Sequence, residues 1–198
     1  MDYGPFLGAG ATLAAAFVTI YLPRAIRRRN QVLYRLKDNR YFQGEINERI
    51  HREHDFGIIY VDLDNFTQLR KNSRRTSERL LARIAQTIFN VVGHRGHLFR
   101  CAGDEFGVLV HARPTDQLVE MAEQIRVAVE LAGDPDDSKV TVSLGVANVP
   151  PTPGYEAYSR VYEAVYAAKL SGKNRVVACP LTEEQKTAVR NAHERSRS

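Results

Sequence analysis

Cysteine is scarce in this sequence: only two of its 198 residues are cysteine, Cys101 and Cys179. Two cysteines cannot form the several bridges of a disulfide-stabilised secreted domain, and they do not supply the clustered ligands of a zinc site. This composition is consistent with a reducing compartment. At this length the chain can bury a hydrophobic core, and we expect one domain with an appendage.

Charge is absent from the beginning of the chain. Residues 3–23 contain no Asp, Glu, Lys or Arg, and most of them are apolar or small. About twenty such residues, at about 1.5 Å each, span the hydrocarbon core of a bilayer. Asp2 precedes the run and an arginine cluster begins at Arg24, which is typical of an uncleaved anchor followed by a cytoplasmic domain. We therefore predict a single-pass transmembrane helix at residues 1–23 in the cytoplasmic membrane, the alternative being a buried core helix.

Aromatic residues are absent from the second basic cluster, at residues 70–79, which contains Arg70, Lys71, Arg74, Arg75 and Arg79. Surfaces that bind single-stranded nucleic acid usually combine basic side chains with stacking aromatic ones. The net charge of +5 therefore does not lead us to expect a nucleic-acid partner.

Residues 24–55 are expected to form a juxtamembrane segment and leading helices. Apolar residues four positions apart predict an amphipathic helix at residues 41–54. Similar periodicity predicts helices at 115–131 and 155–171, and β-branched residues predict a strand at 139–149. The end of the chain, residues 180–198, is charged and poor in apolar residues, so we expect a loose helix or disorder there.

A first acidic pair ends an apolar, β-rich run at residues 57–64. Alternation along a strand places Asp62 and Asp64 on one face, with Leu63 on the other. Carboxylates at the end of a buried strand are typical ligands of a hard divalent cation such as Mg²⁺, which also binds phosphate oxygens.

A second acidic pair lies in a predicted hairpin. Residues 97–99 and 106–110 have the character of strands, and Gly103 between them is expected to supply the positive φ of a tight turn. Asp104 and Glu105 follow this glycine directly. A solvated acidic turn is one interpretation; with two acidic clusters on neighbouring strands, the other is a two-metal phosphoryl-transfer site.

Four segments occur in a characteristic order: VDLDNF at 61–66, RCAGDEF at 100–106, TVSLGVA at 141–147 and AVYAAKLSGKNRV at 164–176. Together they resemble the GGDEF domain of diguanylate cyclases, with Ala102 in place of the first glycine. The resemblance covers about residues 30–178. It implies an α/β fold (an α+β sandwich) of palm-like βαββαβ order with a mostly antiparallel sheet at residues 56–178, followed by a charged tail at 179–198.

The resemblance also implies roles for individual residues. Asp104 and Glu105 would be catalytic, and Glu105 would hold a second cation or take the proton from an attacking 3′-hydroxyl. The implied ligands of Mg²⁺ or Mn²⁺ are Asp62, the Leu63 carbonyl, Asp104 and Glu105. The implied substrate contacts are Asp64, Phe66, Arg70, Glu78, Gly103, Lys169 and Lys173. The substrate would be GTP or another nucleoside triphosphate, and joining two nucleotides implies a homodimer.

Several positions differ from the family pattern. Thr67 stands where the family has a lysine that contacts phosphate. Arg70 and Glu78 occupy the two positions that read the base. Tyr162 replaces an Asp near the start of a helix. Gly93 and Gly96 stand where the family's inhibitory product site has Arg and Asp, so we expect no inhibitory site. Hydrogen-bonded base discrimination is lost when one partner is missing.

Three hypotheses therefore remain from the sequence. The protein is a diguanylate cyclase, a cyclase with another base specificity, or a degenerate membrane-anchored module that binds nucleotide or protein without turnover.

Overall fold

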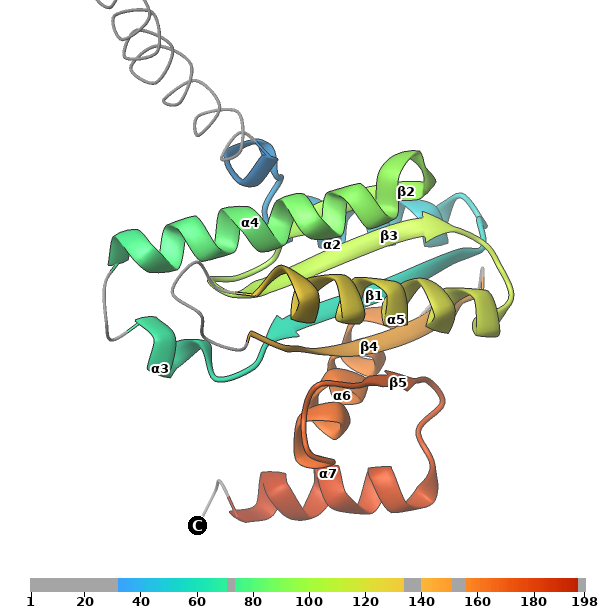
Figure 1. The fold of residues 1–198 in the computed structure, drawn as a ribbon. Coiled ribbons are helices and arrows are strands. Elements are labelled where there is room, and N and C mark those ends of the chain that lie inside the picture. The colour runs from blue at the N-terminus through green and yellow to red at the C-terminus, as the bar shows by residue number, and fades with distance from the viewer. Residues whose placement is uncertain (1–31, 71–73, 134–139, 151–155, 196–198) are drawn as a thin grey trace, which may run out of the picture.

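A five-stranded sheet crosses the part of the chain that the computed structural model describes, which is residues 32–70, 74–133, 140–150 and 156–195 (Figure 1). In chain order the strands are β1 (Phe56–Leu63), β2 (Gly96–Arg100), β3 (Glu105–His111), β4 (Val142–Val149) and β5 (Val176–Ala178). Their order in the sheet is β2-β3-β1-β4-β5, with only the β4–β5 pair parallel. The predicted α/β fold with a mostly antiparallel sheet is confirmed, and β5 makes the sheet mixed.

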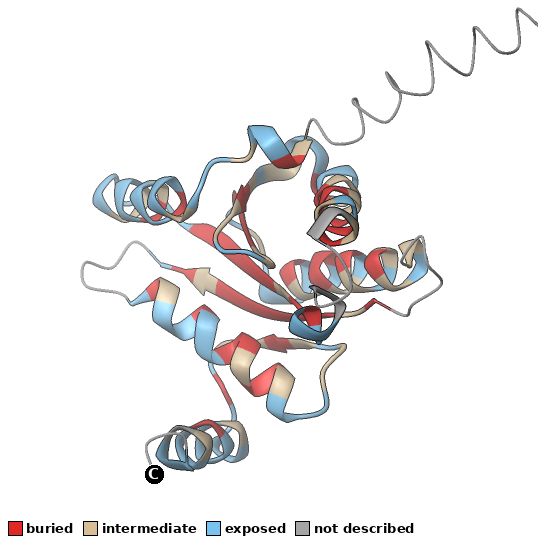
Figure 2. Ribbon diagram, turned by 90° about the vertical axis from the view of Figure 1, so that its left-hand side faces the viewer, coloured by how far each residue is buried: buried red, intermediate tan, exposed pale blue. Residues whose placement is uncertain are grey.

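Helices cover both faces of this sheet. They are α2 (Asn39–His51), α3 (Phe66–Arg70), α4 (Arg74–Val92), the 3₁₀ helix η1 (Gly93–Arg95), α5 (Thr115–Ala132), α6 (Ala157–Leu170) and α7 (Glu183–Arg195). One core cluster joins α4 and α5 to the sheet, and a second joins α2 and α6 to its other face. Figure 2 shows the buried residues on the sides of the helices that face the strands.

The central strand β1 is buried on both faces. Ile59, Val61 and Leu63 belong to the α4–α5 side of the core, whereas Ile58 and Tyr60 belong to the α2–α6 side. A strand covered on both faces reads as a continuous apolar run, as residues 57–63 largely do. Every residue of β1 is buried except Asp62, so polar chemistry on this strand is confined to its carboxyl end.

Helix α6 approaches the sheet more closely than most residues would permit. A Cβ added to Gly145 on β4 would lie 2.3 Å from the carbonyl oxygen of Val161 and 2.8 Å from the amide nitrogen of Val165. Only glycine admits a helix backbone at this distance. The close packing fixes α6 along the sheet and brings its last turn, with Lys169, to the end of β1.

The predicted elements are recovered with small shifts at their ends. The helix expected at 41–54 is α2, which begins after Asp38; the Asp38 carboxylate accepts hydrogen bonds from the amides of Arg40 (3.0 Å) and Tyr41 (3.3 Å). The helices expected at 115–131 and 155–171 are α5 and α6, and the strand expected at 139–149 is β4.

The end of the chain, where we expected a loose helix or disorder, forms the helix α7, and it is more closely packed than expected. Leu181 and Val189 are buried in a cluster with Ala164 and Ala168, so α7 packs on α6. Two well-spaced apolar residues suffice for this contact because the facing residues of α6 are alanines, which let the helices approach.

The transmembrane anchor predicted at residues 1–23 lies outside the described residues and stays a prediction. Within the ranges that the structure describes, no helix has the length and apolar character needed to cross a bilayer.

Candidate functional site

Three carboxylates meet where β1 ends and β3 begins; we call Asp62, Asp104 and Glu105 the carboxylate cluster. Asp62 lies directly opposite Glu105 in the antiparallel register, and such opposite residues share one face of a sheet. The Leu63 amide donates a hydrogen bond of 3.3 Å to the Asp104 carbonyl, which fixes the hairpin beside the end of β1. The two acidic segments of the sequence are therefore neighbours in space.

The Asp62 carboxylate is half-buried and pairs with one lysine. Its Oδ1 accepts a hydrogen bond from the Lys169 ammonium at 2.5 Å. Burial raises the pKa of Asp62 to about 6; the Lys169 contact opposes this rise, and the negative charges of Asp104 and Glu105 add to it. The single positive charge of Lys169 thus does not offset burial and the negative charges of the carboxylate cluster.

The Glu105 carboxylate is held by a buried tyrosine. The Tyr60 hydroxyl donates to Glu105 Oε2 at 2.8 Å, and the Tyr158 hydroxyl lies 3.4 Å from that of Tyr60. Tyr60 is fully buried, and burial foremost raises its pKa far above the usual value for a phenol. Tyr60 therefore keeps its proton and remains a donor to Glu105.

The hairpin tip is shaped by its backbone and by Arg100. The Cys101 amide donates to the Glu105 carbonyl at 2.9 Å, and the Arg100 guanidinium donates to the Gly103 carbonyl at 2.9 Å. The prediction of a positive φ at Gly103 is wrong, because the positive-φ glycines of the described chain lie elsewhere. A Cβ at Gly103 would meet nothing within 4 Å, so the turn forms without glycine's special conformation and the space beside it is open.

Asp64 lies just beyond β1 and is almost completely buried, at 3% exposure. Its Oδ1 accepts from the Ser143 hydroxyl (2.7 Å), and its Oδ2 accepts from the Thr141 hydroxyl (2.8 Å) and the Asn174 amide (3.1 Å). A carboxylate whose two oxygens are filled by the chain's own donors acts as a structural anchor. The structure thus fills both oxygens of Asp64, a predicted substrate contact, with donors from the chain itself.

The turn after α6 is held in an uncommon backbone conformation. Gly172, Lys173 and Asn174 all have positive φ. The Asn174 side chain bonds to Arg126 (3.0 Å) and Glu130 (3.3 Å) of α5, while its amide bonds to Asp64. This network directs Lys173 back to β1, where its ammonium donates to Asn65 Oδ1. Lys169 and Lys173 thus reach the same end of β1.

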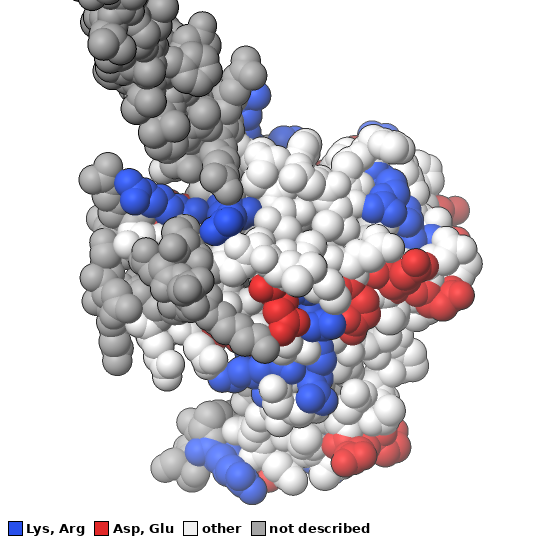
Figure 3. Space-filling model, in the orientation of Figure 1, with Lys and Arg blue, Asp and Glu red and all other residues white. Residues whose placement is uncertain are grey.

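Acidic and basic side chains lie side by side on the face shown in Figure 3. On α5, for example, the Arg126 guanidinium pairs with Glu123 at 2.6 Å and with Glu130 at 2.9 Å. Arg126 thus offsets part of the negative charge of α5.

The carboxylate cluster offers oxygen atoms, which are the ligand type that a hard divalent cation prefers. Mg²⁺ and Mn²⁺ prefer oxygen ligands, and Mg²⁺ is usually held by one or two carboxylates together with substrate phosphates. Asp62 Oδ1 already accepts a cationic group, the Lys169 ammonium. Among the described residues, no group of three or more His, Cys, Asp or Glu side chains is arranged to hold a metal ion by itself. An ion here therefore depends on carbonyl and phosphate oxygens as well as on the carboxylates.

The remaining predicted substrate contacts lie in different settings. Phe66 is 6% exposed and packs in the α4–α5 core. Glu78 on α4 lies 4.0 Å from the Arg100 guanidinium. Arg70 ends α3, and its side chain lies outside the described part of the chain.

Sequence reasoning missed Tyr60, Ser143 and Asn174 as parts of the site. Tyr60 stands in an apolar run where any large residue suits the core, so no pattern distinguished its hydroxyl. Ser143 and Asn174 both lie inside segments that carried the family resemblance, and a polar residue in a buried strand is the signal that could have drawn attention to Ser143.

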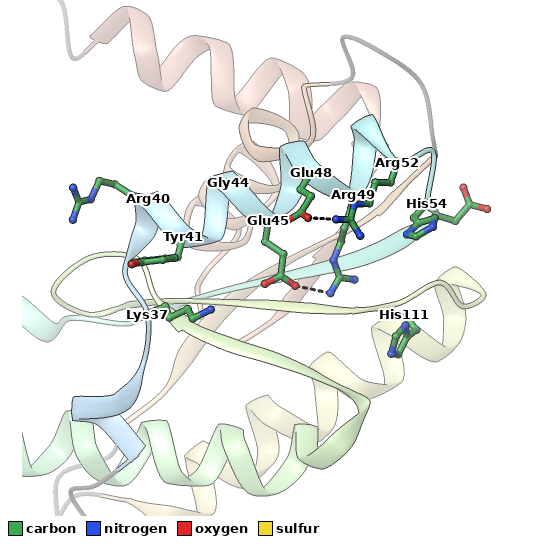
Figure 4. Close-up of a pocket in the computed structure, with 11 residues that line it drawn as sticks. Lys37, Arg40, Tyr41, Gly44, Glu45, Glu48, Arg49, Arg52, His54 and His111 are labelled. Carbon is green, nitrogen blue, oxygen red and sulfur yellow. Dashed lines mark hydrogen bonds and ion pairs between the residues drawn. The ribbon is translucent and has the colours of Figure 1, made fainter.

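A hollow of about 850 Å³ lies along α2, away from the carboxylate cluster (Figure 4). We call it the α2 groove; it is lined by Lys37, Arg40, Tyr41, Gly44, Glu45, Glu48, Arg49, Arg52, His54, Asp55 and His111. His111 pairs with Phe56, the first residue of β1, so this end of the groove lies at the opposite end of the strand from Asp62. Two of its acids are paired one turn apart, Glu45 with Arg49 and Glu48 with Arg52, each at 2.7 Å.

Comparison with known families assigns the chain. The family model described as "Diguanylate cyclase, GGDEF domain" matches residues 31–175, which is well over half of the sequence. The protein belongs to the GGDEF family, and the resemblance inferred from the four sequence segments is confirmed.

Its similarity to individual proteins is more distant. Uncharacterized membrane proteins of Staphylococcus aureus are 28% identical over 147 residues, which cover 70% of this chain and 41% of theirs. The chain thus spans less than half the length of these curated relatives.

Solved structures with a similar fold include three bacterial proteins. The GGDEF domain of DgcB from Caulobacter crescentus, in complex with c-di-GMP, is 24% identical with a TM-score of 0.65, covering 72% of this chain and 91% of that one. The GGDEF domain of YfiN (TpbB) from Pseudomonas aeruginosa is 19% identical with a TM-score of 0.66, covering 75% and 99%. The diguanylate cyclase SiaD, in complex with its activator SiaC from Pseudomonas aeruginosa, is 20% identical with a TM-score of 0.67, covering 85% and 72%. At these identities the likeness establishes the fold.

Proposed function

We propose that this protein is a metal-dependent nucleotidyl cyclase of the diguanylate cyclase type, which converts two molecules of GTP into cyclic di-GMP. The observation that supports this most is the placement of Asp62 opposite Glu105, beside Asp104 and in contact with Lys169. Membership of the GGDEF family makes this the first reaction to test.

Each residue of the site has a role in this proposal. The carboxylate cluster and the Leu63 carbonyl would hold Mg²⁺ or Mn²⁺, which would supply positive charge against the triphosphate. Lys169 and Lys173 bind phosphate oxygens, since both ammonium groups reach the end of β1. Asp64 positions the strand end and the turn after α6 through Thr141, Ser143 and Asn174 and does not touch the nucleotide.

In the proposed reaction, the 3′-hydroxyl oxygen of one nucleotide forms a bond to the α-phosphorus of the other. The bond between that phosphorus and the oxygen bridging to the β-phosphate breaks, and pyrophosphate leaves with the electron pair. Glu105 accepts the hydroxyl proton. A second identical step closes the ring, so each cyclic dinucleotide releases two pyrophosphates.

Tyr60 is the positioning residue for Glu105. Its hydroxyl occupies Glu105 Oε2, which leaves the other carboxylate oxygen to face the reacting groups. A fixed donor from a fully buried residue holds a carboxylate in one rotamer without an entropy cost at each turnover.

Two copies of the chain are needed in this proposal. Each carboxylate cluster serves one nucleotide, so ring closure requires two clusters to face each other in a homodimer. An anchor at residues 1–23 would hold both copies on the cytoplasmic face of the membrane, and the naming of the Staphylococcus aureus relatives as membrane proteins supports this location.

A binding module without turnover is the second candidate. Glu78, in a position that reads the base in the family, lies next to the Arg100 guanidinium, and Lys169 sits on Asp62. In these contacts, side chains that the proposed reaction would use are already paired with each other. This favours a domain that binds nucleotide or protein without turnover. A cyclase with altered base specificity is the third.

Incubation of the purified full-length protein with each labelled triphosphate and Mg²⁺ or Mn²⁺, followed by chromatography, decides among the three. Cyclic di-GMP from GTP, lost in Asp104→Asn and retained in the exposed α5 variant Glu120→Gln, supports the proposal. A product from ATP or from mixed nucleotides supports altered specificity. No cyclic or linear dinucleotide from any triphosphate would falsify both enzyme proposals and leave the binding module.

A further inference from the structure

Lys169 has two partners in the proposed site, and its ammonium cannot serve both at once. It donates to Asp62 Oδ1 at 2.5 Å, and the pair is largely shielded from solvent, with the Lys169 side chain 28% and the Asp62 side chain 13% exposed. The proposed function also assigns Lys169 to phosphate oxygens. A divalent cation would use the Asp62 carboxylate as well, so the ammonium and the cation compete for one group.

A divalent cation at Asp62 is incompatible with the present position of the Lys169 ammonium. Ligand oxygens approach Mg²⁺ to about 2.1 Å, so an ion bound to Asp62 would face an ammonium that is held on the same carboxylate. Like charges at such separations repel, and they repel more strongly where solvent is largely excluded. The ammonium therefore has to leave Asp62 when a cation binds there.

The helix that carries Lys169 stays in place during such a movement. The backbone of α6 packs against Gly145, where an added Cβ would lie 2.3 Å from a carbonyl oxygen of the helix. The end of α6 is held as well, because the Lys173 amide donates to the Ala168 carbonyl at 3.1 Å. The lysine side chain, by contrast, is a flexible four-carbon stem. Release of Asp62 is thus a change in side-chain conformation alone.

Phosphate favours this movement in two ways. In the described part of the chain, no three side chains among His, Cys, Asp and Glu are arranged to hold a metal ion by themselves, so a cation completes its coordination with phosphate oxygens. The departing ammonium of Lys169 also finds a new anionic partner when phosphate is present. A cation that arrives alone displaces Lys169 from Asp62 and offers it no other partner.

We propose that Lys169 is an exchangeable counter-ion, which neutralises Asp62 until a divalent cation arrives with a triphosphate and then moves from the carboxylate to a phosphate oxygen. This proposal rests on the proposed function, because it uses the metal and phosphate sites named there. Its consequence is positive coupling: cation and triphosphate each raise the affinity of the protein for the other. The cation alone binds weakly.

Lys173 is a matched control for Lys169. Its ammonium reaches the same end of β1, but it donates to the neutral side-chain oxygen of Asn65. Removing either lysine takes one positive charge from this part of the site. Only the removal of Lys169 frees a carboxylate, so competition for Asp62 can be separated from a general electrostatic effect.

Binding of Mn²⁺ alone to the purified full-length protein tests the competition, with free Mn²⁺ measured by electron paramagnetic resonance. Lys169→Met keeps an unbranched side chain without the charge, and it raises the affinity for Mn²⁺ roughly 5- to 150-fold, the usual range of coupling between two sites. Lys173→Met leaves Asp62 paired and changes this affinity by less than about threefold, since solvent screens its charge. Lys169→Arg keeps the cation and retains the weak binding of the wild type.

Binding of the Mn²⁺ complex of inorganic tripolyphosphate tests the movement to phosphate. Lys169→Met lowers this affinity roughly 10- to 150-fold, which corresponds to the loss of one hydrogen bond to a charged group. The same substitution thus strengthens the binding of Mn²⁺ alone and weakens the binding of its phosphate complex. A folding defect would weaken both.

The possible failures are distinguishable. If Lys169→Met binds Mn²⁺ alone no more tightly than Lys173→Met does, the exchange is overturned, and cyclic dinucleotide formation by the wild type leaves the proposed function standing. An unchanged affinity of Lys169→Met for the tripolyphosphate complex overturns the exchange as well. If both changes are specific to Lys169 but no triphosphate is turned over, the exchange stands and the cyclase proposal fails. If Mn²⁺ binds to none of these proteins, with or without tripolyphosphate, the proposed metal site fails and the exchange fails with it.

Discussion

Two half-buried acids of this molecule, each beside a cationic side chain, respond in opposite directions. In the α2 groove, burial acts to raise the pKa of Glu45, but hydrogen bonds from Arg49 and His97 outweigh it and hold the pKa below its usual value. In the carboxylate cluster, burial raises the pKa of Asp62 to about 6 although Lys169 donates to it. The difference follows from the neighbours: Glu45 has two partners that favour its charge, whereas Asp62 shares one lysine with two more carboxylates.

This comparison shows why the α2 groove is not the first candidate for chemistry. In the α2 groove, Glu45 and Glu48 are each neutralised by an arginine one turn along the helix. The carboxylate cluster carries negative charge that the described chain only partly offsets, and such charge is typical of a site that uses a cation or moves a proton.

The largest effect is expected from exchanging one acid in each region. Asp62→Asn removes a proposed metal ligand and lowers nucleotide turnover on the order of 10³-fold. Glu45→Gln removes a partly buried acid from the α2 groove and leaves turnover unchanged. Rates of pyrophosphate release measure both, and equal effects of the two substitutions would end the distinction between the regions.

A smaller loss is expected when Glu105 keeps its charge but loses its donor. Tyr60→Phe removes one hydroxyl from a buried position, and a hydrogen bond to a charged group corresponds to roughly 10- to 150-fold. We expect kcat to fall within this range while KM for the triphosphate is unchanged, and Mn²⁺ to bind more weakly.

The control for this prediction is Tyr158→Phe, which removes a hydroxyl that lies 3.4 Å from that of Tyr60. It should change kcat less than Tyr60→Phe does. If Tyr60→Phe lowers thermal stability but leaves kcat and Mn²⁺ affinity intact, Tyr60 has only a packing role.

The stability of the metal-free protein should record the raised pKa of Asp62. The folded state holds a proton on Asp62 up to about pH 6, whereas an unfolded Asp loses it near about pH 3.9, so this group's contribution to stability falls as pH rises between these values. Asp62→Asn should remove this fall, on the order of 1–3 kcal/mol. Urea unfolding in EDTA from pH 4 to 7 measures it, and parallel curves for both proteins would contradict the assignment.

The smallest effect on the pH dependence of stability is expected from Glu45, and its sign is opposite to that of Asp62. Its lowered pKa means that it stabilises the folded state above the pKa of an unfolded Glu, near about 4.3, and that this contribution is lost as pH falls. Solvent screening of this partly exposed pair limits the loss to under about 1 kcal/mol. Urea unfolding of Glu45→Gln between pH 3 and 6 should show a shallower acid decline than the wild type, and a steeper one would reverse the comparison.

Much of this site could be predicted because the spacing of its acidic residues in the sequence indicates it. Two acids after an apolar run and two acids in a hairpin indicated neighbouring strands, and the register places Asp62 opposite Glu105. The prediction was weaker for Asp64, because alternation predicts the face of a side chain but not whether donors such as Ser143 fill it.

The remaining residues could not be predicted because their role depends on contacts distant in sequence. Tyr60 and Glu105 are joined across the β1–β3 pair, and Tyr162 reaches Tyr60 only because Gly145 admits α6 close to the sheet. The position of the hairpin around Gly103 was predicted correctly, but the backbone conformation of Gly103 was not. A connection of four residues can reverse the chain without a positive φ at this glycine.

The sequence by itself determined the family, the order of the helices and strands and the approximate place of the carboxylates, because hydrophobic periodicity and short motifs are local properties. The tertiary structure alone decided which acids are crowded and which are satisfied. It brings the Lys169 ammonium to Asp62 and places hydrogen-bond donors of the chain at both oxygens of Asp64. It also holds Glu105 through the hydroxyl of the buried Tyr60. These differences arise from burial and from neighbours brought together by packing, which no single stretch of the chain encodes.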